Sequence, residues 1–321
     1  MKTDTADPAE GRIAIIGAGH VGATAAYALM LRALFLEIVL IDSNRALAEA
    51  EAADIADANA LARPSRIWAG DYTEAASASM ALITAGGATH GGQTRLSVAA
   101  QSAAIVSDCV GSLMDAGFRG VIVVSANPVD LMTRVALHRS GLPPAQVIGT
   151  GTLLDTSRLK QSLSAALNVS PASIDALVLG EHGDSEVAVF SAVRVGGQTL
   201  EQFCAGSRAL DQTSIARQVR DAGYDIVKGK GYTSWGVATA IVRICEAVVR
   251  NERAVLPVST LLSGQYGLSD LCLSLPCVVG AGGIERILTP DLEPDEAVAL
   301  AASGKLLMTA FAAISEVASA T

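Results

Sequence analysis

The sequence of 321 residues lacks any uninterrupted apolar run of the roughly 20 residues that a membrane span requires. Its mean hydropathy of +0.41 comes from alanine-rich and valine-rich stretches that charged residues interrupt repeatedly. The first ten residues are polar and lack the apolar core of a secretion signal. These absences predict a cytoplasmic protein without a membrane span, and we expect residues 1–10 to form a loose tail.

The chain also lacks an excess of basic residues and any clustering of cysteines. A net charge of −9 without a local basic patch disfavours binding to nucleic acid. The five cysteines show no C-x-x-C spacing and no nearby histidine pattern, so we expect no metal site and reduced, buried thiols. What the sequence does contain is 50% hydrophobic residues, enough for a sizeable core in a folded protein.

The first half of the chain alternates short β-branched runs with alanine-rich and leucine-rich segments. Residues 12–17 form a β-branched run that stops at glycines, and residues 20–32 then favour a helix. Further strand-like runs lie at 37–41, 80–84 and 121–125, and helix-compatible sequence lies at 46–62 and 96–116. This alternation predicts an α/β fold with a doubly wound parallel sheet covered by helices.

The pattern changes after about Gly149. We expect helices at 155–167, 208–226, 233–251 and 294–319, strands at 174–179 and 188–194, and a hairpin at the glycine-rich turn 280–283. We therefore expect two domains, residues 1–149 and an α+β substrate domain at 150–321. The chain shows no internal repeat and no disordered linker, so the two should share a tight interface.

A glycine motif follows the first predicted strand and opens the first predicted helix. Gly17 suits a sharp turn, Gly19 lets the backbone approach a pyrophosphate, and Gly22 allows the helix to pack closely on the sheet. The N-terminus of the helix then offers N–H groups to phosphates. A glycine-rich turn without a ligand is the alternative for this motif taken alone.

Asp42 strengthens the prediction of a dinucleotide site. It lies 20 residues after Gly22 at the end of the second predicted strand, where a carboxylate accepts hydrogen bonds from a ribose. A carboxylate there repels a 2′-phosphate, so NAD is favoured over NADP, although Arg45 keeps that choice open. The alternative role for Asp42 is a helix N-cap, which is compatible with either cofactor.

His182 is the only histidine in a glycine-flanked turn after a predicted strand, and it can donate or accept a proton near neutral pH. A surface or core histidine is the alternative. Asp155 read alone is a helix N-cap. Arg158 follows three residues later on the same helix face, so both side chains can point into one pocket. A surface ion pair is the alternative for Arg158.

Six ordered motifs give the chain a resemblance to the lactate/malate dehydrogenase family over essentially its whole length. They lie at 17–22, 85–96, 126–129, 149–158, 180–184 and 230–235. The resemblance implies a Rossmann-type domain that binds NAD, an oxidoreductase that acts on 2-hydroxy acids, and a homotetramer or homodimer. It implies further that the cofactor contacts lie at His20, Val21, Ala85, Gly86 and Asn127, besides the glycines and Asp42.

The resemblance also assigns the catalytic groups. It makes His182 the proton carrier, Asp155 its orienting partner, Arg158 the group that binds the substrate carboxylate, and Arg95 the lid residue that polarises the carbonyl. Asn127 is implied near the reacting centre, with a turn-forming Asn-Pro as the alternative. The four glycines in the stretch 86–95 suit a hinged lid.

The chain departs from the family pattern on the lid. The position six residues before Arg95 carries glutamine in lactate enzymes and arginine in malate enzymes, whereas here it is Thr89. Without a cation there, a second substrate carboxylate would lack a partner, which argues against oxaloacetate. Thr233 supports a small neutral substituent, and Gly91 in place of the proline common in lactate enzymes predicts a looser lid.

We therefore expect an L-lactate dehydrogenase that reduces pyruvate and also accepts bulkier 2-keto acids. The family pattern assigns no role to His90. A malate dehydrogenase of the lactate-like type and a non-catalytic NAD-binding protein remain as alternatives. Bacterial lactate enzymes that bind fructose 1,6-bisphosphate use an arginine and a histidine where this chain has Lys160 and Asp175. Because Asp175 would repel a bisphosphate, we expect no activation by that effector.

Overall fold

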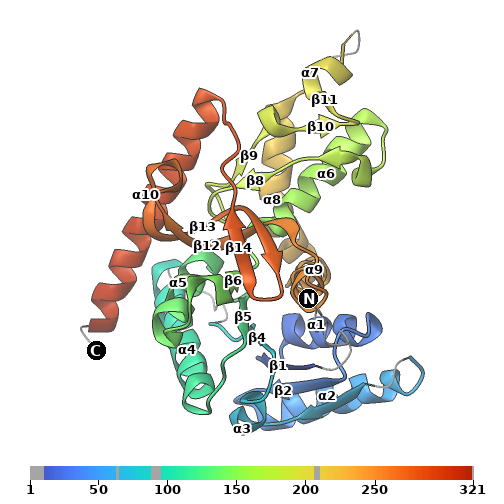
Figure 1. Ribbon diagram of the computed structural model, residues 1–321, viewed down its shortest axis with the longest axis vertical. Helices are drawn as coiled ribbons and strands as arrows, with labels where there is room; N and C mark the ends of the chain where they lie inside the picture. The colour runs from blue at the N-terminus through green and yellow to red at the C-terminus, as the bar shows by residue number, and fades with distance from the viewer. Residues whose placement is uncertain (1–10, 63–64, 88–94, 206–209, 320–321) are drawn as a thin grey trace, which may run out of the picture.

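The computed structural model describes residues 11–62, 65–87, 95–205 and 210–319. In this part of the chain a nine-stranded sheet runs through the molecule, and helices cover both of its faces (Figure 1). The sheet order is β14-β13-β12-β6-β5-β4-β1-β2-β3. The predicted α/β class with a doubly wound sheet is confirmed.

The parallel half of the sheet comes entirely from the first 149 residues. Its strands are β1 (Arg12–Ile16), β2 (Glu37–Ile41), β3 (Arg66–Ala69), β4 (Met80–Ile83), β5 (Val121–Val124) and β6 (Val147–Gly149). All of their pairings are parallel, in the spatial order 3-2-1-4-5-6. The strand order reverses between β1 and β4, and this switch point is where doubly wound sheets bind ligands.

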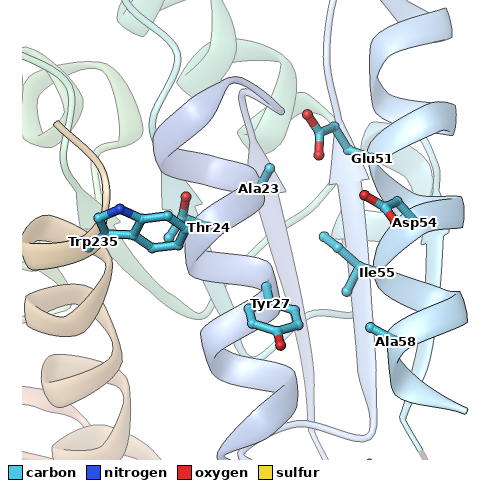
Figure 2. Close-up of a pocket in the computed structure, with 8 residues that line it drawn as sticks. All are labelled: Ala23, Thr24, Tyr27, Glu51, Asp54, Ile55, Ala58 and Trp235. Carbon is cyan, nitrogen blue, oxygen red and sulfur yellow. The ribbon is translucent and has the colours of Figure 1, made fainter. Parts of the chain in front are cut away.

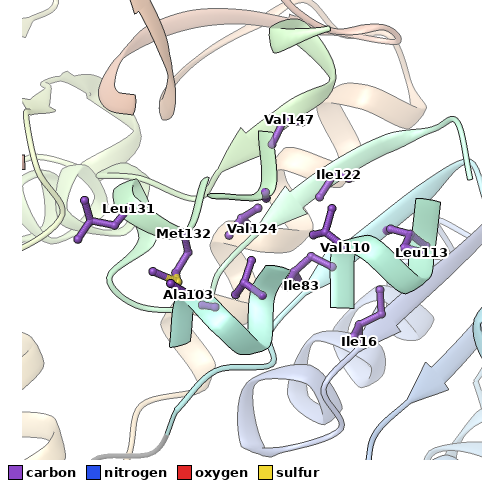
Figure 3. Packing of buried hydrophobic residues seen from close by; sticks show 14 of the residues in the cluster. Ile16, Ile83, Ala103, Val110, Leu113, Ile122, Val124, Leu131, Met132 and Val147 are labelled. Atoms are coloured by element: carbon purple, nitrogen blue, oxygen red, sulfur yellow. The ribbon is translucent and has the colours of Figure 1, made fainter. Parts of the chain in front are cut away.

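Helices pack on both faces of these strands because the strands are apolar on both sides. The helices of this half are α1 (His20–Leu31), α2 (Arg45–Asn59), α3 (Tyr72–Ala75), α4 (Arg95–Asp115) and α5 (Val129–Ser140). Figure 3 shows the packing of one face, where Val110 and Leu113 of α4 and Met132 of α5 meet the side chains of the central strands. The opposite face packs against α1, α2 and α9 (Trp235–Val249).

The sheet continues beyond residue 149 as an antiparallel hairpin and a further strand. These strands are β12 (Ala254–Ser263), β13 (Ser269–Gly280) and β14 (Gly283–Ile287), and β12 joins β6 where Ser259 pairs with Gly149. The predicted glycine hairpin is confirmed, with Gly283 at a φ of +97°. The second half of the chain therefore extends the sheet of the first half, a feature that the local sequence pattern did not indicate.

The small strands β7 to β11, described below, lie with α6, α7 and α8 in the upper part of the molecule in Figure 1, whereas α10 runs down its left side. The predicted strands at 174–179 and 188–194 were wrong as continuous strands. The first divides into β7 (Ile174–Asp175) and β8 (Val178–Leu179), which join different small sheets. The second is β9 (Val187–Ala188) and β10 (Arg194–Val195), separated by a tight turn in which Val193 N–H donates to Phe190 C=O at 3.1 Å.

The other elements complete the described chain. They are α6 (Leu153–Leu167), β11 (Gln198–Thr199), α7 (Leu200–Phe203), α8 (Gln212–Lys230), α10 (Pro294–Ser319) and the short 3₁₀ turns Pro144–Gln146, Pro171–Ser173, Phe190–Ala192 and Gln265–Gly267. The predicted C-terminal helix agrees with α10 at both ends.

Helix α10 is the one described helix that is long and apolar enough to cross a membrane by length and composition. Its segment Pro294–Ile314 has a mean hydropathy of 1.8. Leu300, Leu307 and Ile314, spaced seven residues apart, are buried in the same core cluster as α4 and α5. A single helix of this kind is weak evidence for a membrane span, because packed core helices have the same composition.

Candidate active site

The predicted site residues gather at the carboxyl ends of the parallel strands. Gly17 follows β1, Asp42 follows β2, Ala85 lies just beyond β4, and Asn127 comes shortly after β5. Asp155 lies in the first turn of α6, after β6. Because these strands are parallel and adjacent, their carboxyl ends form one edge of the sheet, so residues far apart in sequence face a common crevice.

The glycine turn after β1 depends on its glycines in two different ways. Gly17 has a φ of +106°, and a Cβ on it would lie 2.6 Å from Ala85 N. A Cβ on Gly22 would lie 1.8 Å from Gly17 O, so the helix packs against the turn only with glycine there. A Cβ on Gly19 would meet no described atom within 4 Å. Gly19 therefore borders open space, which suits the approach of a ligand.

The start of α1 fits the pyrophosphate of a dinucleotide. Gly19 is the N-cap residue of α1, and no side chain in the described structure caps its first turn. The N–H groups at such a helix end carry a partial positive charge and bind anions readily. The chain thus offers an uncapped helix terminus beside a turn with space for phosphate.

Asp42 lies beside the same turn and is not a helix N-cap. Its Oδ2 accepts a hydrogen bond from Ala18 N–H at 2.7 Å, and its Oδ1 accepts one from Asn44 N–H at 2.8 Å. The N-cap of α2 is Asn44, whose side chain accepts from Leu47 N–H. The N-cap alternative for Asp42 was therefore wrong, because the helix begins two residues later than that role requires.

Arg45, which kept the choice between NAD and NADP open, has its guanidinium bound within the protein. Its Nε donates to Glu49 Oε1 at 2.8 Å, and its terminal nitrogens donate to Ala69 O and Gly70 O, both at 2.9 Å. These three bonds direct the guanidinium toward the end of β3.

A cavity of about 600 Å³ lies next to this edge of the sheet, between the two halves of the chain. Its polar lining contains the predicted residues Asn127, Asp155, Arg158, His182 and Thr233. Val21 and Gly87 also line it, so the cavity adjoins the glycine turn. The structure therefore brings together side chains from α6, the loop after β8 and the start of α9.

His182, Asp155 and Arg158 form a connected charged group in this cavity. His182 Nδ1 lies 2.5 Å from Asp155 Oδ2, and an Arg158 terminal nitrogen donates to Asp155 Oδ1 at 2.8 Å. The side chain of Asp155 is 2% exposed, that of Arg158 17% and that of His182 26%. Asp155 is not a helix N-cap, because Thr152 is the N-cap of α6. Arg158 does not form a surface ion pair, because its pair with Asp155 is largely buried.

The charges of this group stabilise one another. Burial alone lowers the pKa of the His182 imidazole, but the Asp155 carboxylate outweighs burial and the pKa rises to about 9. Burial raises the pKa of Asp155, yet His182 and Arg158 together hold it below its ordinary value. At neutral pH the imidazole is therefore protonated and the carboxylate ionised.

Asp130 is a site residue that sequence reasoning missed. It is buried on α5, and its Oδ2 accepts a hydrogen bond from the backbone N–H of His182 at 2.8 Å. Burial raises its pKa to about 6. The available signal was that this acidic residue, three residues after Asn127, lies within the buried stretch that begins at Val129. Asp130 fixes the backbone of the loop that carries His182.

A second contact fixes the same loop from the opposite side. Tyr224 of α8 donates from its hydroxyl to Asp184 Oδ1 at 2.7 Å. The loop 180–186 is therefore held between α5 and α8. Arg220 of α8 and Glu186 of the loop also line the cavity, and the sequence motifs did not single out either of them.

Several predicted residues lie at the margin of the described structure or outside it. Thr89, His90 and Gly91 lie outside the described residues. Arg95 begins α4, and its side chain is not among the described ones. His20 stacks on Tyr232 with ring centroids 3.9 Å apart, which links the glycine turn to the loop before α9. Ala85 and Gly86 follow shortly after β4, just before residues 88–94, which lie outside the described part of the chain.

A smaller cavity of about 210 Å³ lies outside this site, between α1 and α2 (Figure 2). Tyr27 of α1 lines it, Glu51 and Asp54 of α2 form its acidic side, and Trp235 lies on the other side at the start of α9. None of the predicted catalytic residues lines this cavity.

Comparison with known proteins gives one consistent result. Residues 11–149 match the model of the lactate/malate dehydrogenase NAD binding domain, and residues 152–317 match that of the lactate/malate dehydrogenase alpha/beta C-terminal domain. The chain is 39% identical to an L-lactate dehydrogenase of Treponema denticola, over 95% of this chain and 98% of that protein. It is 40% identical to one of Thermus aquaticus, over 94% of this chain and 99% of that protein.

Solved structures agree with these sequence relatives. The minor L-lactate dehydrogenase of Enterococcus mundtii in its ligands-bound form superposes with a TM-score of 0.92 at 37% identity, covering 94% of this chain and 98% of that one. A lactate dehydrogenase from a deep-sea metagenome library superposes with a TM-score of 0.93 at 34% identity, covering 96% of this chain and 99% of that one. By its sequence, its sheet and the residues of its cavity, the chain belongs to the lactate/malate dehydrogenase family.

Proposed function

We propose that the protein is an NAD-dependent L-2-hydroxyacid dehydrogenase that interconverts pyruvate and L-lactate. The observation that carries this proposal is the protonated His182 imidazole, bound to buried Asp155 beside Arg158 in a cavity next to the dinucleotide turn. The L-lactate dehydrogenases among its relatives support the substrate and its handedness.

Reduction of a 2-keto acid requires a proton at the ketone oxygen and a partner for the carboxylate. Because His182 Nδ1 is bound to Asp155, its Nε2 is the atom that donates the proton. Arg158 uses one terminal nitrogen for Asp155 and keeps further N–H donors of its planar fork for the substrate carboxylate. In the oxidation direction, the same imidazole must first lose its proton.

The cofactor in this proposal is NAD, which supplies or accepts the hydride when bound. Gly17, Gly19 and Gly22 shape the turn for its pyrophosphate, and the uncapped start of α1 offers the N–H donors. Asp42 would accept hydrogen bonds from the adenosine ribose. His20, Val21, Ala85, Gly86 and Asn127 would border the remainder of the dinucleotide.

The preference for NAD over NADP rests on two side chains. Asp42 presents a carboxylate where a 2′-phosphate would lie. Arg45, the nearest cation along the chain, is bound to Glu49 and to two carbonyl groups at the end of β3. A 2′-phosphate would therefore meet repulsion without a compensating guanidinium.

The lid residues complete the proposed site. We assign Arg95 the role of stabilising the negative charge that develops on the carbonyl oxygen, and its loss should cost about 2.7–4 kcal/mol. Thr89 brings no charge to the substrate side chain, and Thr233 lines the cavity with a small polar group. This combination favours pyruvate and larger neutral 2-keto acids.

One observation favours the malate alternative. Arg220 lines the same cavity and could meet a second carboxylate. Its Nε, however, is paired with Asp221 Oδ1 at 3.1 Å, which reduces its net charge toward a ligand. We therefore retain pyruvate as the substrate and oxaloacetate as the competitor to be tested.

The deciding experiment is a steady-state comparison of kcat/KM for pyruvate, 2-ketobutyrate, 2-ketoisocaproate and oxaloacetate with NADH. We expect pyruvate or a larger neutral keto acid to exceed oxaloacetate. His182→Gln should abolish turnover, whereas His138→Gln, which changes an exposed histidine on α5, should not. A preference for oxaloacetate would refute the lid argument, and no turnover of any keto acid would favour a non-catalytic NAD-binding protein.

We propose that the chain divides into a dinucleotide-binding domain at 11–149 and a substrate domain from 150 onward. The bounds of the two matched family models support this division. The continuous sheet across β6 and β12 makes the two parts rigid partners. The five cysteines, none in a disulfide, support action in a reducing compartment such as the cytoplasm.

We propose further that the protein is a homo-oligomer, a tetramer or a dimer. Tyr27 of α1 and Trp235 of α9, which line the cavity in Figure 2, are 40% and 66% exposed, and Leu31, four residues after Tyr27 on α1, is 43% exposed. Large apolar side chains grouped on one face are typical of a subunit contact. Sedimentation analysis of the wild type and of Leu31→Glu tests this: the variant should be smaller, and a monomeric wild type would refute the proposal.

A further inference from the structure

Glu186 is an acidic side chain inside the catalytic cavity that the proposed mechanism does not use. It ends the loop that carries His182, immediately before β9, and it lines the cavity together with Asp155, Arg158 and Arg220. Its Oε1 is buried and finds no hydrogen-bond partner among the described residues. Glu181 of the same loop differs, because its carboxylate accepts from Ser185 Oγ at 2.5 Å.

The charged groups around Glu186 come from three elements. Asp155 and Arg158 face it from α6, His182 from its own loop, and Arg220 from α8. Burial and, after it, the Asp155 carboxylate raise the pKa of Glu186 to about 8, although the three cations lower it. Asp184, Glu181 and Tyr224 also line the cavity. At neutral pH the Glu186 carboxyl therefore keeps its proton.

We propose that Glu186 is a positioning residue of the substrate site, a neutral carboxyl whose loss of a proton weakens the hold of Arg158 on the substrate carboxylate. The inference rests on the proposed function, since it requires an anionic substrate at Arg158. It adds to that function a second titrating group, besides His182, that weakens substrate binding at alkaline pH.

The charge balance of the cavity supports this role. Ionisation of Glu186 would add a negative charge among Asp155, Arg158, His182 and Arg220, in a cavity that Glu181 and Asp184 also line. It would therefore lower the positive potential that a 2-keto acid anion meets at Arg158. The new carboxylate would also compete with the substrate carboxylate for the N–H donors of Arg158, because both are acceptors for the same planar fork.

The test is the affinity of the enzyme–NADH complex for oxamate, an unreactive anion of the shape of pyruvate, at pH 7 and pH 9. A carboxyl with a pKa of about 8 is about 90% ionised at pH 9, so its ionisation weakens binding by up to about tenfold. Glu186→Gln stays neutral at both pH values. The loss of affinity between pH 7 and pH 9 should therefore be up to about tenfold smaller in this variant.

Glu201→Gln is the matched control, since Glu201 is an exposed glutamate on α7 away from the cavity. It should lose affinity between pH 7 and pH 9 as the wild type does. Deprotonation of His182 contributes to the loss in all three proteins, and in Glu186→Gln it moves to lower pH because Glu186 raises the pKa of His182. An equal pH dependence in the wild type and Glu186→Gln would overturn the inference and leave the proposed function intact.

Arg220→Gln provides a second test if Glu186→Gln does not fold. Removing the guanidinium takes away a charge that favours ionised Glu186, so the alkaline loss of oxamate affinity should move to higher pH, and Arg220→Lys should move it less. An unmoved profile would overturn the inference. A folded protein whose NADH complex binds no oxamate at either pH would overturn both the inference and the proposed function.

Discussion

Replacing Asp155 by asparagine should shift the pH range in which the enzyme reduces pyruvate. Asp155 is the charge that raises the pKa of His182 to about 9 against the effect of burial. Without that carboxylate, burial opposes the imidazolium and only the weaker effects of Asp130 and Glu186 favour it, so the pKa of His182 should fall toward its ordinary value of 6.5.

The magnitude follows from the protonated fraction. At pH 7.5 an imidazole with a pKa of about 9 is about 97% protonated, whereas one with a pKa of about 6.5 is only about 9% protonated. Protonation alone therefore predicts a loss of up to about tenfold in pyruvate reduction. Loss of the bond at His182 Nδ1 adds to this, because the ring is then free to adopt the wrong tautomer and orientation.

The assay is kcat/KM for pyruvate with NADH between pH 5.5 and 10. Wild-type activity governed by His182 should be lost as pH rises through about 9, and the variant should lose it by pH 6.5. Asp115→Asn, at the exposed C-terminal end of α4, is the control and should follow the wild type. A variant that folds and keeps the alkaline limit of the wild type would refute the reasoning.

Three further predictions test the substrate group, the dinucleotide turn and regulation. Arg158→Lys should lower kcat/KM for pyruvate by about 10- to 100-fold, chiefly through KM, because an ammonium cannot replace a bidentate guanidinium; an unchanged KM would contradict this. Gly22→Ala should weaken NADH binding and lower Tm, because its Cβ would lie 1.8 Å from Gly17 O. Fluorescence titration would measure the NADH affinity, and calorimetry would measure Tm. Fructose 1,6-bisphosphate should leave the pyruvate saturation curve unchanged, because Asp175 is exposed and acidic and would repel the bisphosphate. A leftward shift of the curve would contradict this prediction. Asp175→Asn would then test whether the effector binds at this position.

Seven of the strands and helices of the first half were predicted because their signals are local, whereas β3, β6, α3 and α5 were not predicted. An apolar strand that ends at a glycine turn has the same pattern wherever it lies, so β1, β2 and α1 agree with prediction within one residue. The segments 174–179 and 188–194 failed for the opposite reason. Each segment divides into two short strands that belong to different small sheets, and many of their apolar residues pack into a core cluster separate from those on the two faces of the main sheet. Along the chain, the spacing of these apolar residues is the same as in one continuous strand.

The residues of the candidate site divide in the same way. His182, Asp155 and Arg158 lie in motifs with fixed spacing, which the sequence displays directly. Asp130 acts through a hydrogen bond to the backbone of a residue 52 positions away, and Glu186 matters because of what surrounds it. Neither relation leaves a pattern along the chain.

The sequence by itself determined the order of elements, the family and the chemical identity of the groups at the strand ends, because these depend on side chains and short spacings. Only the tertiary structure decided that Asn44 and not Asp42 caps α2, that β12 continues the sheet from β6, and that one buried oxygen of Glu186 has no hydrogen-bond partner among the described residues. Burial and charge at a point in space are sums over residues distant in sequence, so they exist only once the chain has folded.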